Sequence, residues 1–429
     1  MTASQPQADF QRDFAEVVVH KLRVAGFTAL WAGGCVRDLL VGLTPKDYDV
    51  ATDARPEQVR DVFGRRKTLA VGESFGVIIV LSPNRAAGHI EVATFRNDGQ
   101  YIDGRRPESV EFSSPEEDAR RRDFTINGMF YDPVEEKVLD YVGGETDLKR
   151  GVIRAIGTAR HRFEEDKLRL LRAVRFAATF DFTLEEDTAQ AAREMASQIT
   201  VVSAERIAQE LRRMLSHRNR AVAIRLCREV NLLPHILPEL DAVSGDEQLW
   251  RELLNALTAL GEVDFSIGLG LLFCSAIDQS GLAEKPASQL VFDAGKRLRL
   301  SNDEIHHTEW LVRFRDVLGC VQELSLAQLK RVLSEPLAED LLALLEARLC
   351  ATGSSCEPVE FCRRFLAETS PEVINPPPLI SGDQLIAAGF RPGPRFKHIL
   401  EVVRDAQLNL EISDSDEAMD LALRIADGE

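Results

Sequence analysis

Two glycines and two aspartates near the N-terminus have the types and spacing of a phosphate-handling site. In the segment WAGGCVRDLLVGLTPKDYDV, Gly33 and Gly34 follow a short apolar run, and Asp47-Tyr48-Asp49 stands further along. We predict a strand-to-helix turn at the glycines, where the lack of a side chain lets the backbone approach a ligand closely. Residues two apart on a strand share a face, so Asp47 and Asp49 are expected to project together from one strand.

Two neighbouring carboxylates repel each other unless a cation lies between them. Oxygen ligands shared with substrate phosphates are typical of Mg²⁺. Glu91, in the run HIEVATF, would supply a third carboxylate if its strand lay beside the first. Metal ions held here would polarise an attacking oxygen and neutralise the leaving group, which indicates phosphoryl or nucleotidyl transfer. The simpler interpretation, an Asp-x-Asp on a solvated strand edge, is disfavoured by the adjacent Gly-Gly turn. No Gly-Lys-Ser/Thr follows, so this is not a Walker loop.

Asp166 and Arg169, in RHRFEEDKLRLLR, could read a nucleobase. Three residues apart on a predicted helix, they would share a face. A carboxylate only accepts hydrogen bonds and a guanidinium only donates them. The pair therefore fits adenine and cytosine, whose Watson–Crick edges place an amino donor beside a ring-nitrogen acceptor, and it mismatches guanine and uracil. An ordinary surface ion pair is the alternative interpretation of the same two residues.

The elements that must position these residues follow from the apolar pattern. The first third alternates short β-type runs with loops, and the connection SPNRAAG predicts a hairpin between two of them. The expected strands are Phe27–Trp31, Asp47–Ala51, Val77–Leu81 and His89–Phe95. Ser114-Pro115-Glu116-Glu117 has the pattern of a helix start. Apolar residues at three- and four-residue spacing predict one long amphipathic helix over Phe163–Phe180, and the rest of the chain is mostly helical by pattern.

Composition excludes several classes of protein. The 429 residues are 45% hydrophobic and 28% charged, which is ordinary for a folded chain. The longest uncharged apolar stretch, Phe265–Ile277, is shorter than the roughly 18 residues that a membrane span needs. Seven cysteines without a CxxC, and an N-terminus without an apolar signal region, favour a cytoplasmic location.

The net charge of -17 is distributed unevenly. Residues 1–150 have a net charge of -5, residues 151–235 of +4 and residues 236–429 of -16. The cations of the middle segment are nearly all arginine, which suits forked contacts to phosphates. Solvated helix faces would give the same count, but the neighbouring motifs favour a local, salt-sensitive nucleic-acid site.

The motifs together resemble the class II tRNA nucleotidyltransferases, a family with a polymerase-β-like head that contains the CCA-adding enzymes and the bacterial poly(A) polymerases. GGCVRD with DYD resembles the catalytic motif, and RRDFTING resembles the second motif, except that Gly128 stands where many relatives have Ala. DYVGGETDL resembles the hinge motif, and EEDKLRLLR the nucleotide-reading motif.

The resemblance implies a role for each matching residue. Asp47 and Asp49 would be the catalytic metal ligands, with Glu91 as the weakest match for a third carboxylate. The same resemblance implies a set of nucleotide-binding residues, namely Gly33, Gly34, Arg37, Arg122, Asp123, Asn127, Asp166, Arg169, Arg172 and Arg175. Mg²⁺ would be the cofactor, and ATP, CTP and the 3′ end of tRNA would be the substrates.

The implied fold class is α+β, a nucleotidyltransferase head with a small mixed sheet followed by an all-helical neck, body and tail. We expect the head over residues 1–150, the base-reading neck over 151–240, the body over 241–370 and a tRNA-binding tail over 371–429. The segment TFRNDGQYIDGRRPESVEFSSPEEDA resembles the flexible loop of adenosine-adding members, which argues against a CC-only enzyme.

Three functions remain open at this stage. Complete CCA addition and A-only addition need the same residues, so the motifs do not separate them. A poly(A) polymerase would use the same chemistry on other RNA ends, although the basic C-terminal extension that we associate with these enzymes is absent. A catalytically inactive RNA-binding relative is the third alternative. The oligomeric state and the grip of body and tail on RNA are also left open.

Overall fold

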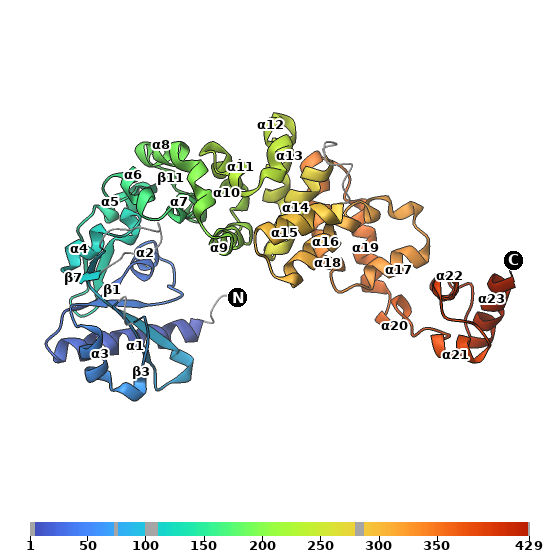
Figure 1. Cartoon of the computed structure of the whole chain (residues 1–429), viewed down its shortest axis with the longest axis horizontal. Helices are drawn as coiled ribbons and strands as arrows, with labels where there is room; N and C mark the ends of the chain where they lie inside the picture. The colour runs from blue at the N-terminus through green and yellow to red at the C-terminus, as the bar shows by residue number, and fades with distance from the viewer. Residues whose placement is uncertain (1–4, 73–75, 99–109, 279–286, 428–429) are drawn as a thin grey trace. The chain divides into compact units, whose positions relative to one another are not determined.

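A seven-stranded mixed sheet forms the framework of the N-terminal part of the chain (Figure 1). The computed structural model describes residues 5–72, 76–98, 110–278 and 287–427. The strand order is β3-β4-β5-β2-β1-β8-β9, and every pair is antiparallel except β2 and β5. The strands are β1 (Ala29–Ala32), β2 (Asp49–Thr52), β3 (Thr68–Gly72), β4 (Val77–Leu81), β5 (His89–Thr94), β8 (Met129–Asp132) and β9 (Lys137–Asp140).

The central strands are the most apolar ones. All four residues of β1 are buried, as are three of the four residues of β2. The predicted hairpin is confirmed, because β4 and β5 pair antiparallel across residues 82–88. Small sheets accompany the main one, formed by β6 (Arg96–Asp98) with β7 (Val110–Phe112), and by β10 (Val152–Ile153) with β11 (Thr183–Leu184).

Helices surround the sheet and continue beyond it. Helix α4 begins as predicted, with a capping box. The Ser114 side chain accepts a hydrogen bond from the backbone N–H of Glu117, and the Glu117 carboxylate accepts one from the backbone N–H of Ser114. The helices of this part are α1 (Gln5–Val24), α2 (Gly34–Leu40), α3 (Pro56–Phe63), α4 (Pro115–Arg120), α5 (Gly144–Arg150), α6 (Ala159–Glu165), α7 (Leu168–Phe180), α8 (Glu186–Met195), α9 (Ala204–Leu215), α10 (Arg220–Glu229) and α11 (Leu233–Ile236).

The predicted single helix over 163–180 is wrong, because the chain breaks between α6 and α7. Asp166 has an extended backbone (φ -146°, ψ 107°), and its side chain accepts from the backbone N–H of Leu168. Aspartate often makes such a bond two residues ahead, and the bond competes with helical pairing. The apolar spacing continues across the break, which is why periodicity alone did not reveal it.

The C-terminal part is helical throughout its described residues. Helix α14 carries almost no polar residue, and its side chains are buried nearly all round, so the longest apolar stretch is a core helix. The helices are α12 (Asp241–Gly245), α13 (Glu247–Ala259), α14 (Phe265–Asp278), α15 (Ala287–Arg297), α16 (Asn302–Phe314), α17 (Leu326–Leu333), α18 (Ala338–Thr352), α19 (Glu357–Glu368), α20 (Pro371–Ile374), α21 (Gly382–Ala387), α22 (Pro394–Leu408) and α23 (Ser415–Asp427).

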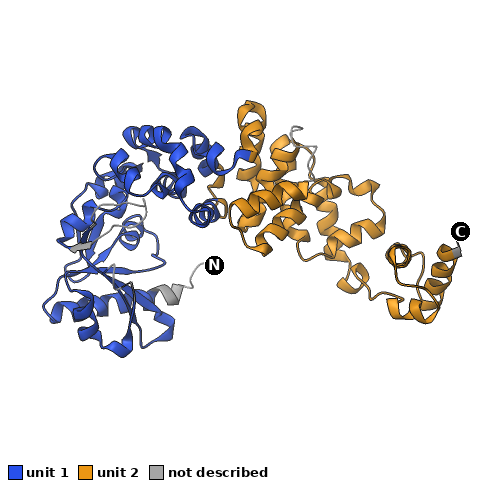
Figure 2. Cartoon of the chain, viewed as in Figure 1, with its two compact units in different colours: residues 1–214, 222–238 blue, residues 215–221, 239–429 orange. Residues whose placement is uncertain are grey.

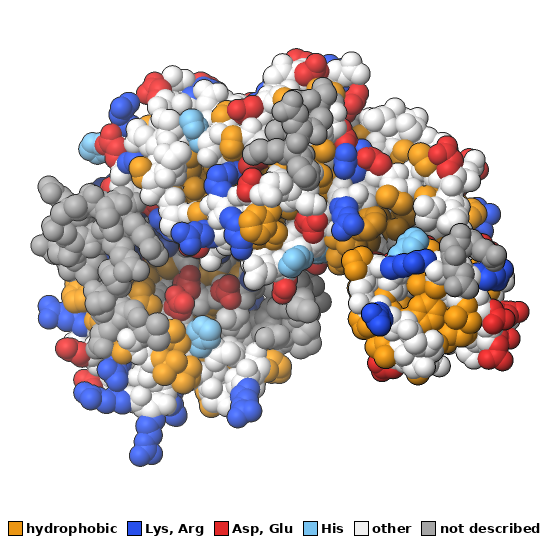
Figure 3. All heavy atoms as spheres, turned by 45° about the vertical axis from the view of Figure 1, so that its right-hand side comes forward, with side chains coloured by type: hydrophobic (Ala, Val, Ile, Leu, Met, Phe, Trp, Pro, Cys, Tyr) orange, Lys and Arg blue, Asp and Glu red, His pale blue; other side chains and the backbone are white. Residues whose placement is uncertain are grey.

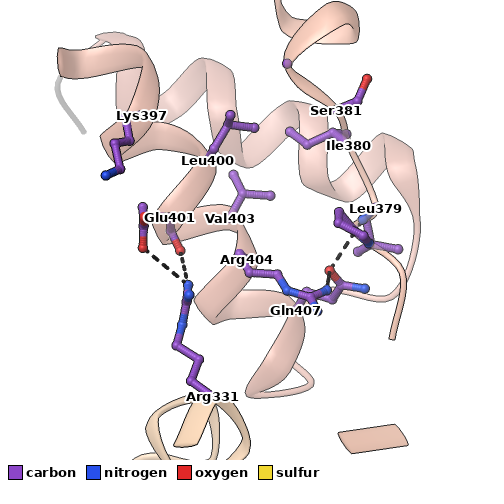
Figure 4. A pocket seen from close by; sticks show the side chains of 12 residues that line it. Arg331, Leu379, Ile380, Ser381, Lys397, Leu400, Glu401, Val403, Arg404 and Gln407 are labelled. Atoms are coloured by element: carbon purple, nitrogen blue, oxygen red, sulfur yellow. Dashed lines mark hydrogen bonds and ion pairs between the residues drawn. The ribbon is translucent and has the colours of Figure 1, made fainter. Parts of the chain in front are cut away.

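A cavity of about 500 Å³ lies between residues 378–382 and α22 near the C-terminus, with Arg331 of α17 at its edge (Figure 4). Leu379, Leu400 and Val403 contribute apolar lining. Both arginines that line it already have partners, since Arg331 pairs with Asp405 and Arg404 donates to the Gln407 amide oxygen at 2.7 Å. Much of the polar lining is therefore engaged within the fold.

The chain forms two compact units (Figure 2). Unit 1 comprises residues 1–214 and 222–238, and unit 2 comprises residues 215–221 and 239–429. The α+β fold class is confirmed, whereas the four-part division at residues 150, 240 and 370 stays a prediction. No helix in the described part of the chain is long and apolar enough to cross a membrane.

Candidate active site

The predicted carboxylates gather where β2 begins. Asp49 is the first residue of β2 and pairs in register with Glu91 of the parallel strand β5. Paired residues on adjacent strands lie on the same face, so Glu91 lies beside Asp49 as the third-carboxylate hypothesis requires. Both side chains are open to solvent. The strand order therefore produces a carboxylate pair that two distant sequence segments supply.

Asp47 lies outside the strand that we predicted for it. The last residue of β1 to pair with β2 is Ala32, opposite Asp49, because the chain then turns at Gly33 into α2. Asp47 thus has no β1 partner left and lies in the exposed connection before β2. It is still close enough to Asp49 for its charge to raise the pKa of that carboxyl.

The electrostatics of Asp49 are those of a cation site. Crowding by protein atoms, then the Glu91 charge, raise the pKa of Asp49 to about 6 against the opposing effect of Arg122. A divalent cation would relieve the repulsion, and carboxylate oxygens are ligands that Mg²⁺ prefers. Among the described residues no three His, Cys, Asp or Glu side chains converge enough to enclose a metal ion. The carboxylate oxygens of Asp49 and Glu91 are of the kind that suits Mg²⁺, which would need further oxygen ligands to complete its shell.

Gly33 turns the chain beside these carboxylates, as predicted. Its backbone (φ 71°, ψ -123°) is one that side chains rarely permit. A Cβ on Gly33 would also lie 2.8 Å from Nη1 of Arg122. Gly34 begins α2, and a Cβ there would make only ordinary contact with Arg37. Conformation thus requires the first glycine, and a side chain there would also displace the end of the Arg122 side chain.

A buried network joins Arg37, Asn127, Asp123 and Arg172. Arg37 Nη1 donates to Asn127 Oδ1 at 2.7 Å, and Asn127 Nδ2 donates to Asp123 Oδ1 at 3.0 Å. The other oxygen of Asp123 accepts from Nε (2.8 Å) and Nη2 (2.6 Å) of Arg172. Burial opposes ionisation of Asp123, but Arg172 and these hydrogen bonds hold its pKa well below the usual range. Four predicted site residues thus form one connected group.

Asp118 is a site residue that sequence reasoning missed. It is almost fully buried on α4 and accepts from Arg121 and Arg122, with Arg122 Nη2 at 2.9 Å. Both arginines lower the pKa of Asp118 against the effect of its burial. Arg122 is thereby held next to Gly33. The helix start at Ser114 was a signal for α4, and the arginines three and four residues after Asp118 were a signal for its partners, although the same spacing is common on solvated helix faces.

Asp166 and Arg169 are brought close together but are not paired with each other. No hydrogen bond or ion pair links their side chains within the described residues; instead, the Arg169 N–H donates to the Asp166 carbonyl at 3.0 Å. The Arg169 guanidinium is buried, pairs with Glu165 and donates to the Arg162 and Arg121 carbonyls. The expectation that both residues share a helix face is wrong, because Asp166 lies in the break before α7.

Two partners from α9 complete this region. Arg206 donates to both oxygens of Asp166, at 2.7 and 3.2 Å. Glu210 is buried and accepts from Arg175 Nε. Sequence reasoning did not select either residue. On one face of the molecule, Asp and Glu side chains gather in a hollow left of centre, and Lys and Arg side chains lie above them (Figure 3).

Two further predictions concern glycines and the loop. A Cβ on Gly128 would lie 2.7 Å from Val142 and 3.0 Å from Ile156, so the packing of this chain accounts for the departure from the second motif at Gly128. The predicted flexible loop runs over residues 94–119, and its residues 99–109 lie outside the described part of the chain.

Comparison with known proteins agrees with this site. Residues 29–154 match the poly A polymerase head domain, and residues 181–243 match the probable RNA and SrmB-binding site of polymerase A. The CCA-adding enzyme of Geobacillus kaustophilus is 33% identical over 414 residues, which is 93% of each chain. The CCA-adding enzyme of Lactococcus lactis subsp. cremoris is 43% identical over 202 residues, so the chain spans about half the length of that relative.

A solved structure extends the likeness to the whole fold. The Bacillus stearothermophilus CCA-adding enzyme in complex with CTP superimposes with a TM-score of 0.76 at 28% identity, covering 95% of this chain and 96% of that one. The predicted resemblance is confirmed. The chain belongs to the class II tRNA nucleotidyltransferase family, which contains the CCA-adding enzymes and the bacterial poly(A) polymerases.

Proposed function

We propose that this chain adds CMP and AMP from CTP and ATP to the 3′ end of tRNA without a template. The observation that carries the proposal is the register of β2 and β5, which aligns Asp49 with Glu91 beside the Gly33 turn. The likeness to CCA-adding enzymes over nearly the full chain supports tRNA as the substrate.

In the proposed reaction the 3′-hydroxyl oxygen of the RNA attacks the α-phosphorus of the nucleotide. The new P–O bond forms as the bond to pyrophosphate breaks, and the hydroxyl proton passes to water or a nearby carboxylate. Asp47 and Asp49 would hold Mg²⁺, with Glu91 as a third carboxylate. When bound, the metal would increase the acidity of the hydroxyl and neutralise charge on the phosphates.

The remaining predicted residues would orient the nucleotide. Arg37, Arg122 and Arg172 are fixed by Asn127, Asp118 and Asp123, so their remaining donors are pre-positioned for the triphosphate. Asp166, which Arg206 holds, would accept from the amino group of cytosine or adenine. Arg169 would donate to the adjacent ring nitrogen.

Nucleotide incorporation on tRNA shortened by one, two or three 3′ residues tests the proposal. Restoration of CCA followed by a stop is expected. Addition of A only to the substrate that ends in CC would reduce the function to A addition. Long A tracts on a generic oligonucleotide would favour the poly(A) polymerase, the alternative to which the family also points. No incorporation in the presence of Mg²⁺ would favour an inactive RNA-binding relative.

A further inference from the structure

Three arginines of the candidate site surround one aromatic ring. Phe176 lies on α7 and is only 5% exposed. The guanidinium carbon of Arg175 is 4.0 Å from its ring centroid, and those of Arg37 and Arg172 are each 5.2 Å away. All are within the roughly 6 Å at which a cation interacts favourably with an aromatic face. Arg37 comes from the head helix α2, so the ring joins the head to α7.

Gathering three like charges has an electrostatic cost that is only partly offset. Each arginine has its own acidic partner, since Arg37 pairs with Asp38, Arg172 with Asp123 and Arg175 with Glu210. Burial lowers the pKa of Arg175, and the neighbouring Arg172 charge acts in the same direction. Burial opposes the charge of Arg172 as well, but Asp123 raises its pKa overall. Arg175 is thus the member that gains most from a further attractive contact, and it is the one nearest the ring, at 4.0 Å.

An aromatic ring can stabilise the guanidinium groups without neutralising their positive charge. A carboxylate at the same position would occupy guanidinium N–H donors and repel a triphosphate. A ring attracts a cation through its quadrupole, whose effect falls off steeply with distance, and it carries no net charge. A ring contact at the guanidinium carbon leaves in-plane N–H groups free for hydrogen bonds. The positive field toward a bound anion is thus preserved.

We propose that Phe176 is a positioning residue for the nucleotide triphosphate, because its π face holds the guanidinium groups of Arg37, Arg172 and Arg175 in one anion-binding arrangement. The inference rests on the proposed function, in which these arginines contact the nucleotide. Phe180 lies one turn further along α7, and its ring centroid is 4.6 Å from the guanidinium carbon of Arg37. It shows no such contact with Arg172 or Arg175 in the described structure, so its contribution should be smaller.

Fluorinated phenylalanines at position 176 test the proposal with little change of shape. One, two and three ring fluorines progressively weaken the quadrupole. We expect the Kd for ATP, and the KM for ATP on tRNA lacking its terminal A, to rise stepwise to about tenfold at three fluorines. The value of kcat should change less, and the thermal midpoint should stay within about a degree. The same series at Phe180 should give a shallower rise.

Phe163 is the matched control, because it is fully buried on α6 and makes no such contact within the described residues. Its fluorination should leave the Kd for ATP unchanged. Phe176→Leu should raise KM at least as much as three fluorines do while the chain stays folded by circular dichroism. A flat Kd across the Phe176 series, or an equal slope at Phe163, overturns the proposal. If the wild type binds ATP without incorporating it, the proposed function fails, and the Kd series still decides the role of Phe176.

Discussion

Asp123 in unit 1 and Arg220 in unit 2 are both buried charges, and their partners differ in kind. Asp123 accepts from the backbone N–H of Phe124 and from the side chains of Asn127 and Arg172. Arg220 is 0% exposed, and within the described part of the chain it donates only to backbone carbonyls, at 2.8 Å to Leu215, 2.7 Å to Leu260 and 2.8 Å to Gly261, with a longer bond to Leu257.

The two residues therefore have different roles: Asp123 orients other side chains, whereas Arg220 provides hydrogen-bond donors for the carbonyls at helix ends. Arg220 satisfies carbonyls where α13 ends, and four of its five N–H groups are used by the fold in this way. Asp123 instead fixes Arg172, whose side chain stays partly exposed. Burial alone therefore does not indicate function; the type of partner does. The following predictions test this contrast between the two units.

Asp49→Ala should have the largest effect, a loss of at least about 10³-fold in nucleotide incorporation without unfolding. Asp49→Asn should be equally inactive. The folded-state pKa of Asp49 is raised to about 6, above the value of about 4 in the unfolded chain. Its ionisation therefore destabilises the folded state increasingly from about pH 4, and fully above about pH 6. Asp49→Asn should therefore unfold at the same or a higher urea midpoint than the wild type at pH 7, and this gain should vanish below about pH 4. If both variants retained activity, Asp49 would not be an active-site carboxylate.

Arg220→Met should lower the free energy of unfolding by about 3 kcal/mol or more, because it leaves several buried carbonyls without donors. Urea denaturation followed by circular dichroism measures this loss. ATP binding by the folded protein should be unchanged at low temperature. A change in ATP affinity that exceeds the change expected from unfolding would contradict a purely structural role.

Gly33→Ala should cost about 1–2 kcal/mol of backbone strain and, in addition, about 10-fold or more in activity, because the new Cβ displaces Arg122. Gly353 is the control in unit 2. Its backbone is left-handed (φ 69°, ψ 21°) and its Cβ position is open, so Gly353→Ala should show backbone strain alone, and less of it than Gly33→Ala because Gly33 has a ψ of -123°. Thermal midpoints and incorporation rates, measured side by side, separate the two effects. Equal activities would show that Arg122 can move freely.

Two capping boxes give the smallest predicted effect. Ser114 and Ser301 each accept from the N–H three residues ahead, in unit 1 and unit 2 respectively. Ser→Ala at either position should cost about 1 kcal/mol. Only Ser114→Ala should also reduce activity, since α4 carries Asp118, which orients Arg122. Similar activity loss in both variants would indicate a general effect of reduced stability.

Features that depend on residues close together in the sequence could be predicted, whereas features that depend on contacts between distant segments could not. The hairpin of β4 and β5, the Gly33 turn and the start of α4 were predicted correctly, because each depends on a few adjacent residues. The strand position of Asp47 was wrong, since it depends on where β1 ends. The break at Asp166 depends on one side-chain bond that apolar spacing does not reveal.

The missed residues are of types that are common on any amphipathic helix. Arg206 and Phe176 contact residues that tertiary folding brings to them from other elements, whereas Asp118 pairs with Arg121 and Arg122, three and four residues ahead in the chain. Arg206 is 40 residues from Asp166 in the chain. Without the fold, such residues are indistinguishable from solvated arginines and core phenylalanines. The resemblance to the family identified the motif residues, but it did not identify the residues that hold them in position.

The break between α6 and α7 couples recognition to backbone shape. The carboxylate that interrupts the helix is the one proposed to select the base, so removing this side chain changes both properties at once. Alanine there would favour a continuous helix and shift Arg169 relative to Arg206, whereas asparagine keeps an oxygen that can accept from the Leu168 N–H. A change of nucleotide preference that preserves the break therefore has to keep such an acceptor at this position or begin with a residue elsewhere that re-aims Asp166, such as Arg206.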